Sequence, residues 1–172
     1  MARTWISAPS LLLTGVVSAL AWLGCTVPHH TVEPYRSDPS AARQLEAEAE
    51  RICREMAPQR GVPDQAFVTD GCSGFPDGSK VACCVQHDIP YWCGGSRDQR
   101  RRADACLARC VASHGAPALG RFMGGGVRIT AHPIVPAHWR WGFGHPYPAG
   151  YDDATSQAPE ADECPVPEAL AR

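Results

Sequence analysis

Residues 81–115 of this 172-residue chain read VACCVQHDIPYWCGGSRDQRRRADACLARCVASHG, and this stretch decides the fold. Residues 81–93 predict one helix, which two successive glycines end. Ser96 and Gln99 then form a capping box that begins a second helix over residues 97–114. Because only three residues join the two helices, we expect them to lie antiparallel and to bury their facing stripes.

Two further helices are predicted on either side of this pair. Asp38 followed by Pro39 is typical of a helix start, and apolar residues then recur on one face of a helix over residues 39–57. Residues 58–80 are dense in glycine, proline and aspartate and predict a shaped loop. A short helix is predicted over residues 117–129. The expected fold class is therefore mostly α.

The N-terminal residues have the pattern of an export leader. Residues 1–24 carry one charge and a long apolar run, which predicts a signal peptide or a lipoprotein leader. The sequence Trp22-Leu23-Gly24-Cys25 is similar to a bacterial lipobox, so Cys25 is the predicted lipidation site. Plain cleavage and an uncleaved membrane anchor are the alternatives. We expect export, either to the bacterial periplasm or outer envelope as a lipoprotein, or by secretion.

Composition and cysteine count agree with an exported domain. A net charge of −2 gives no electrostatic case for a nucleic-acid partner. Nine cysteines in so short a chain indicate an oxidising compartment, and eight remain for four disulfides once Cys25 is set aside. We expect residues 25–37 to be a tether, residues 38–151 the folded, disulfide-braced domain and residues 152–172 an acidic tail.

Residues with catalytic chemistry lie on one face of the first central helix. Cys84, His87, Asp88 and Tyr91 follow the spacing i, i+3, i+4, i+7, which places them along one stripe. Asp104 shares a side of the second central helix with apolar residues, and burying a carboxylate there requires a partner. His87 is the natural partner, because a hydrogen bond to one ring nitrogen leaves the other as a general base.

The remaining acidic groups predict a calcium site beside this base. Asp88 is expected to point beside the imidazole, and the preceding loop offers Asp70, Asp77 and glycine carbonyls. Oxygen ligands of this kind suit Ca²⁺. A hard cation beside a His-Asp base favours hydrolysis, in which His87 deprotonates water while the metal polarises a carbonyl group.

These residues resemble the secreted phospholipase A2 superfamily. The run Cys83-Cys84-Val85-Gln86-His87-Asp88, with Tyr91 four residues after the histidine, looks like the active-site helix of those enzymes. Thr69-Asp70-Gly71-Cys72-Ser73, followed by Pro76-Asp77, is similar to the calcium loop of the bacterial branch. Arg102-Ala103-Asp104, with Cys110 six residues later, resembles the helix that carries the second aspartate.

The resemblance implies a role for each matching residue. It makes His87 the base, Asp104 its orienting partner and Tyr91 a support for the pair. It assigns calcium to the carboxylates of Asp70 and Asp88 and to the Gly71 carbonyl. It implies calcium-dependent hydrolysis of phospholipid sn-2 acyl esters at a membrane surface.

The resemblance also implies two disulfides, Cys72–Cys84 and Cys83–Cys110. The four remaining cysteines allow three pairings, among which Cys93 with Cys106 is favoured.

Other interpretations use the same residues differently. The chain could be a noncatalytic envelope or secreted protein that binds calcium and an unknown protein partner, or a purely structural lipoprotein. Cys83, Cys84 and His87 could instead bind zinc. A basic cluster at the start of the second central helix could contact phospholipid headgroups or form a solvated surface; its members are Arg97, Arg100, Arg101 and Arg102. The aromatic residues within 131–151 could pack over the core or form an interfacial surface.

Overall fold

The computed structural model describes residues 29–130, 143, 151, 152 and 164. In chain order the elements are α1 (Pro39–Met56), the 3-10 turn η1 (Gly78–Lys80), α2 (Val81–Cys93), α3 (Arg97–Ser113) and α4 (Pro117–Thr130). Each helix begins and ends within one residue of its predicted span, so the mostly helical fold class is confirmed. Within the ranges described, no helix is both long and apolar enough to cross a bilayer. The predicted leader and its lipidation site, Cys25, lie outside the described residues.

The helix ends have the local causes that the sequence indicated. The side chain of Asp38 accepts two backbone N–H groups of the first turn of α1, at 2.7 and 3.2 Å. Ser96 and Gln99 form the predicted capping box at the start of α3. Gly94 ends α2 with a φ of 79°, a backbone conformation that favours glycine. Pro90 lies inside α2 without ending it, and its carbonyl accepts the Gly94 N–H at 3.0 Å.

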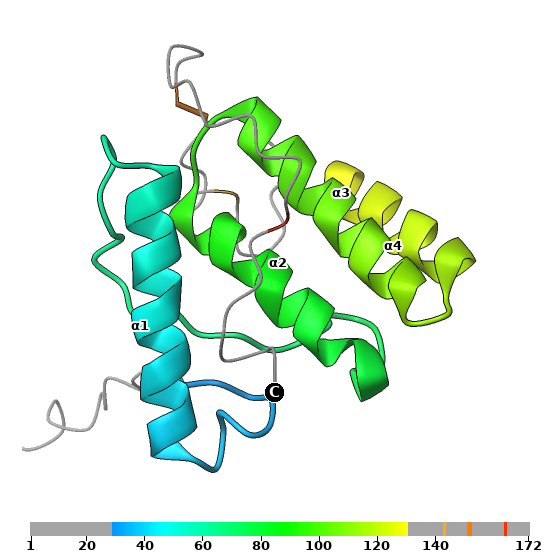
Figure 1. Cartoon of the computed structure of the whole chain (residues 1–172), viewed down its shortest axis with the longest axis horizontal. Coiled ribbons are helices and arrows are strands. Elements are labelled where there is room, and N and C mark those ends of the chain that lie inside the picture. Colours follow the sequence, from blue (N-terminus) through cyan, green and yellow to red (C-terminus); the bar gives the residue numbers. More distant parts are fainter. Residues whose placement is uncertain (1–28, 131–142, 144–150, 153–163, 165–172) are drawn as a thin grey trace, which may run out of the picture.

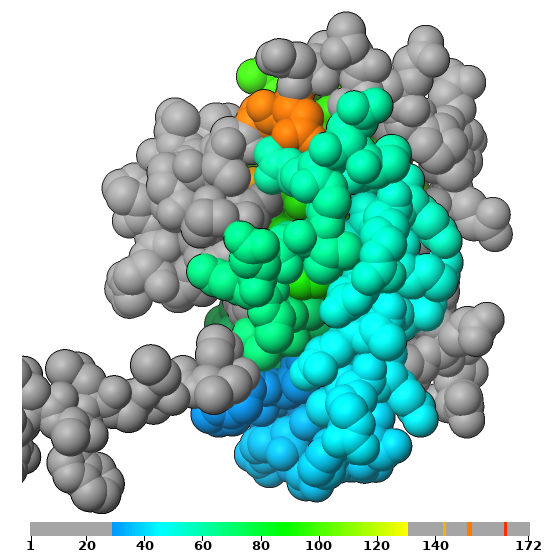
Figure 2. Space-filling view, turned by 90° about the vertical axis from the view of Figure 1, so that its left-hand side faces the viewer, coloured from blue at the N-terminus to red at the C-terminus, as the bar shows by residue number. Residues whose placement is uncertain are grey.

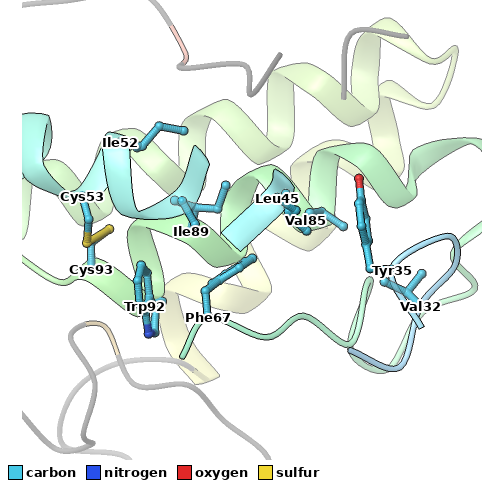
Figure 3. Packing of buried hydrophobic residues seen from close by; sticks show 11 residues of the cluster. Val32, Tyr35, Leu45, Ile52, Cys53, Phe67, Val85, Ile89, Trp92 and Cys93 are labelled. Atoms are coloured by element: carbon cyan, nitrogen blue, oxygen red, sulfur yellow. A yellow bond between two sulfur atoms is a disulfide. The ribbon is translucent and has the colours of Figure 1, made fainter. Parts of the chain in front are cut away.

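The four helices pack in chain order, α1 on α2, α2 on α3 and α3 on α4 (Figure 1). The larger apolar cluster fills the space between α1 and α2 and includes the aromatic side chain of Phe67 from the loop (Figure 3). Full burial of a Leu, Ile or Phe side chain contributes about 1.5–3 kcal/mol, so this contact anchors α2. The buried members of this cluster on the two helices are Leu45, Ala49, Ile52, Cys53, Val85, Ile89, Trp92 and Cys93.

Two glycines let α4 lie close against α3. A Cβ atom added at Gly124 would lie 2.9 Å from the Ala108 Cβ and 3.0 Å from the Asp104 carbonyl oxygen. A Cβ atom at Gly120 would collide with the Ala108 carbonyl oxygen. Larger residues at either position would push α4 outward, so these glycines bring the end of α4 to Asp104.

Four disulfides brace this arrangement. Cys72–Cys84 and Cys83–Cys110 are both present, which confirms the two pairings that the resemblance implied. Adjacent cysteines on a helix point about 100° apart, and for this reason Cys83 and Cys84 reach different partners.

The favoured pairing of Cys93 with Cys106 is wrong. Cys93 bonds to Cys53 on α1, and Cys106 bonds to Cys164 in the C-terminal segment. Cys93 lies at spacing i+4 and i+8 from Ile89 and Val85, on the stripe of α2 that faces α1. This direction excludes a partner on α3.

The described part of the predicted tether is also packed. Val32 and Tyr35 are buried in the cluster between α1 and α2, and the Thr31 N–H donates to the Thr69 carbonyl at 3.1 Å. Burial of these two apolar side chains holds residues 30–35 against the domain, so this part of the segment is not a free tether.

Described residues of the predicted tail also contact the domain. Asp152 accepts the Arg60 Nε–H at 3.0 Å, and residues 151 and 152, orange in Figure 2, lie against the segment that follows α1. Cys164 is tied to α3 through its disulfide. Apart from Phe143, which is buried against Tyr91, the aromatic region over residues 131–142 and 144–150 lies outside the described residues.

Candidate active site

The predicted histidine and aspartate meet between α2 and α3. His87 projects from α2 and Asp104 from α3, and the His87 Nε2 atom lies 3.2 Å from the Asp104 Oδ1 atom. The residues are 8% and 1% exposed, respectively. Because α2 and α3 run antiparallel after a three-residue turn, residues 17 apart in sequence come to the same level. The distance is at the outer end of the range for a general base and its partner.

Tyr91 completes the cluster one helical turn after His87. Its hydroxyl group donates to Asp104 Oδ1 at 2.7 Å, and its ring centroid lies 4.2 Å from that of His87. Burial raises the pKa of Tyr91, and the charge of Asp104 raises it further, so the phenol stays protonated. The Nδ1 atom of His87 has no hydrogen bond to any residue that the structure describes. The structure thus brings the three predicted catalytic residues together and leaves Nδ1 available as a base.

The second oxygen of Asp104 is an exception to ordinary hydrogen bonding. Oδ2 is buried and has no hydrogen-bond partner within the described part of the chain. Arg128 lies near it, with its Nε atom 3.9 Å away on a side chain that is 55% exposed. The hydrogen bonds of Asp104 to His87 and Tyr91 are thus concentrated on Oδ1.

Arg100 lies under this cluster and was not predicted there. It is 5% exposed and donates from Nε to the Tyr91 hydroxyl oxygen at 3.2 Å and from Nη1 to the Tyr151 hydroxyl oxygen at 2.8 Å. Its Nη2 atom donates to the carbonyls of Val127 and Arg128 at 3.0 and 2.8 Å. Burial lowers the pKa of Arg100, but its phenolic partners and the Asp104 charge outweigh this and raise it overall.

The interpretation of the arginines as one basic cluster is therefore wrong for Arg100. Arg97 and Arg101 are exposed and Arg102 is half-buried, whereas Arg100 points into the domain. The sequence contained a signal for the inward position of Arg100, because the buried residues of α3 are spaced i, i+4, i+7 and i+11. The residues at this spacing are Arg100, Asp104, Leu107 and Val111.

The predicted calcium loop is joined to α2 by one threonine. The Thr69 hydroxyl group donates to Asp88 Oδ2 at 2.5 Å and accepts the Gly71 N–H at 3.1 Å. Asp77 Oδ1 accepts the Cys72 N–H at 2.8 Å. The same oxygen lies close to Gly71, and a Cβ atom added at Gly71 would collide with it. Asp88 and Asp77 thus flank the loop from either end.

Electrostatics at this loop favour a bound cation. Burial raises the pKa of Asp88 well above its usual value; the Thr69 hydrogen bond lowers it, and the charges of Asp70 and Asp77 raise it further. A divalent cation at the loop would supply positive charge that offsets the burial of Asp88 and its repulsion by Asp70 and Asp77. Asp70 is exposed, and its two oxygens accept from the Ser73 hydroxyl at 2.8 and 2.7 Å.

The donor chemistry at the loop fits calcium better than zinc. Carboxylate and carbonyl oxygens are the ligands that Ca²⁺ prefers. Among the residues described, one group of three metal-binding side chains has its ligand atoms within 4.8 Å of one another: Cys83, Cys110 and His114. The two sulfurs of that group are bonded to each other, so it offers no thiolate. The carboxylates of the loop are more widely spaced than this in the structure.

The zinc interpretation of Cys83, Cys84 and His87 is wrong. Both cysteines are consumed in disulfides, and a zinc ligand must be a thiolate.

His30 is a second residue near the loop that sequence reasoning missed. Its Nδ1 atom accepts the Thr69 N–H at 3.1 Å, and its Nε2 atom lies 3.2 Å from Glu46 Oε1. Burial lowers the pKa of His30, although Glu46 opposes this. His30 thereby supports Thr69, which in turn binds Asp88. No local pattern predicts this contact, because its partners are 16 and 39 residues away.

The site therefore combines a buried His-Asp-Tyr cluster with an acidic loop that Thr69 joins to Asp88, the residue after His87. Comparison with known proteins finds no matching family model, no matching curated protein and no matching solved structure.

Proposed function

We propose that this protein hydrolyses phospholipid sn-2 acyl esters in a calcium-dependent reaction of the phospholipase A2 type. The observation that carries the proposal is the buried hydrogen bond between His87 and Asp104, with Tyr91 on the same carboxylate oxygen. A His87 Nδ1 atom without a hydrogen bond to the described residues, on the residue before the loop-bound Asp88, supports activation of water rather than a covalent nucleophile.

Each residue has a defined task in this reaction. His87 removes a proton from water at Nδ1, and the resulting imidazolium is stabilised by the Asp104 carboxylate bonded to Nε2. The carboxylates of Asp70 and Asp88 and the Gly71 carbonyl would hold calcium, which supplies positive charge for the developing oxyanion when bound. The water oxygen bonds to the ester carbonyl carbon, and as the bond from this carbon to the alcohol oxygen breaks, His87 returns the proton to the departing oxygen.

Hydrolysis of mixed phospholipid vesicles, measured with calcium and then with a chelator, tests the proposal. His87→Gln is expected to lower the rate by at least about 100-fold, which is the usual contribution of a general base. His114→Gln is a matched control, because His114 is exposed at the end of α3. Equal rates in both conditions, or full activity of His87→Gln, would overturn the proposal.

A second candidate is a noncatalytic calcium-binding interaction protein that is exported. The raised pKa of Asp88 favours it, since the acidic loop gains from a cation whether or not His87 acts as a base. Calcium would then raise the melting temperature without turnover, and Asp88→Asn would abolish that shift. Hydrolysis that depends on both calcium and His87 would exclude this candidate.

We also infer export and a membrane surface as the partner that presents the substrate. Four disulfides among eight cysteines support export, because such bonds persist outside the reducing cytosol. Lipidation of Cys25 and secretion of a cleaved form remain the two routes in this proposal, and mass spectrometry of the mature N-terminus distinguishes them.

A further inference from the structure

The geometry points to Arg100 as a positioning residue that directs the Tyr91 hydroxyl group onto Asp104 and thereby sets the tautomer of His87. The catalytic meaning of this inference rests on the proposed function, but the hydrogen-bond chain itself does not. The chain runs from Arg100 through Tyr91 and Asp104 to His87.

Which group donates and which accepts in these hydrogen bonds follows from the chemistry of arginine. A guanidinium group has five N–H donors and no acceptor, and it stays protonated in proteins. The Tyr91 oxygen therefore accepts from Arg100 Nε, and the Tyr91 proton must go elsewhere. The acceptor within hydrogen-bond distance is Asp104 Oδ1, at 2.7 Å. Arg100 thus directs Tyr91 to donate to the carboxylate.

Asp104, which accepts the Tyr91 proton, then determines which nitrogen of His87 carries the imidazole proton. A carboxylate only accepts hydrogen bonds, so the His87 Nε2 atom, 3.2 Å from Oδ1, must be the donor. Nδ1 is left with its lone pair, as a general base requires. A protonated Asp104 could instead donate to Nε2, which would move the imidazole proton to Nδ1 and remove the base.

Tyr91 and His87 both bond to the same oxygen of Asp104. The residue is almost fully buried, its Oδ2 atom has no hydrogen-bond partner among the residues that the structure describes, and Arg128 reaches only to 3.9 Å from that oxygen. The buried guanidinium of Arg100 supplies a fixed positive charge one hydrogen-bonded residue away, and Tyr91 passes that polarisation to Oδ1.

The guanidinium is held in place by three separate segments. Nε bonds to α2, Nη1 bonds to Tyr151, and Nη2 bonds to the carbonyls of Val127 and Arg128 in the last turn of α4. These carbonyls belong to the helix end that lacks intrahelical partners, so Arg100 also caps α4. A lysine at this position would keep the positive charge but could not donate hydrogen bonds to all of these acceptors, which match the planar guanidinium group.

The test measures the His87 tautomer directly and needs no substrate. Two-bond ¹H–¹⁵N spectra of the full chain at about pH 8, where an unperturbed imidazole is neutral, distinguish Nε2–H from Nδ1–H. We expect the Nε2–H tautomer in the wild type and in the control Arg101→Gln, which alters an exposed neighbour on α3. We expect Arg100→Gln to show a substantial Nδ1–H population.

Two further variants keep the inference falsifiable. Tyr91→Phe removes the link between Arg100 and Asp104 but leaves the bonds of Arg100 to α4 and Tyr151, so it should shift the tautomer in the same direction if Arg100→Gln does not fold. Arg100→Lys should restore part of the Nε2–H population. An unchanged Nε2–H tautomer in folded Arg100→Gln, or in Tyr91→Phe, overturns the inference.

A kinetic measurement separates this inference from the proposed function. If the protein hydrolyses vesicles, Arg100→Gln should lower kcat by about 10- to 100-fold with little change in KM, because the proportion of competent base falls. A tautomer shift in a protein with no hydrolysis would support the role of Arg100 and refute the proposed function.

Discussion

Replacing Thr69 by valine removes the hydroxyl group that joins the acidic loop to α2. The two side chains have nearly the same shape, so the change deletes two hydrogen bonds and little packing. One bond goes to the Asp88 carboxylate at 2.5 Å, and the other comes from the buried N–H of Gly71 at 3.1 Å. We expect Thr69→Val to destabilise the folded protein clearly.

The expected loss of stability follows from the energies of these two hydrogen bonds. A hydrogen bond to a charged group contributes about 1.5–3 kcal/mol, and a buried N–H left without a partner costs about 1–3 kcal/mol. Since such terms are not additive, we expect a loss of about 2–5 kcal/mol in the free energy of unfolding. The difference in unfolding free energy between the wild type and Thr69→Val should become smaller as pH falls. The Thr69 bond lowers the pKa of Asp88, so the variant raises this pKa further and loses more stability as pH rises through it.

Urea unfolding of the disulfide-intact protein, followed by circular dichroism, measures this loss. The m-value should stay unchanged, because the buried surface does not change. Thr31→Val is a matched control: its side chain is exposed, and its backbone bond to Thr69 is retained. The control should stay within about 0.5 kcal/mol of the wild type. A loss below about 0.5 kcal/mol for Thr69→Val itself would refute the role assigned to its hydroxyl group.

Three further predictions test other parts of the structure. Burial lowers the pKa of His30 in the folded state, so the unfolded state binds more protons, and stability should fall as pH drops below the usual imidazole value of about 6.5; His30→Gln should flatten this part of a melting-temperature profile. Replacing Cys53 and Cys93 together by alanine opens a loop of 40 residues and should lower the free energy of unfolding by about 4 kcal/mol in denaturant titrations, whereas an unchanged midpoint would contradict the pairing. Gly124→Ala should destabilise the α3–α4 contact by about 1–3 kcal/mol in the same titrations, while Gly125→Ala, which meets no atom within 4 Å, should stabilise α4 by up to about 1 kcal/mol; equal effects of the two would contradict the close approach of the helices.

The sequence predicted the parts of the site that depend on local spacing. His87 and Tyr91 are four residues apart on one helix, and the three-residue turn after α2 brings Asp104 opposite them. These relations follow from helix geometry and chain length, so they required no knowledge of long-range packing. The helix ends at Asp38 and Ser96 were predictable for the same reason, since a cap satisfies neighbouring backbone groups.

The contacts that sequence reasoning missed all join distant segments. His30 reaches Thr69 across 39 residues, and Arg100 reaches Tyr151 across 51. Cys53 bonds to Cys93 although a nearer partner in sequence was expected. Many partners are possible at such separations, and no local pattern ranks them.

The sequence by itself determined four helices, their ends and the stripe that carries His87, because these depend on helix periodicity and on groups within one turn of each other. Only the tertiary structure decided that Arg100 turns inward and that His30 supports the acidic loop. Those choices depend on which surfaces of α1, α2 and α4 bury one another, and a buried charge or imidazole is tolerated only where folding delivers its hydrogen-bond partners.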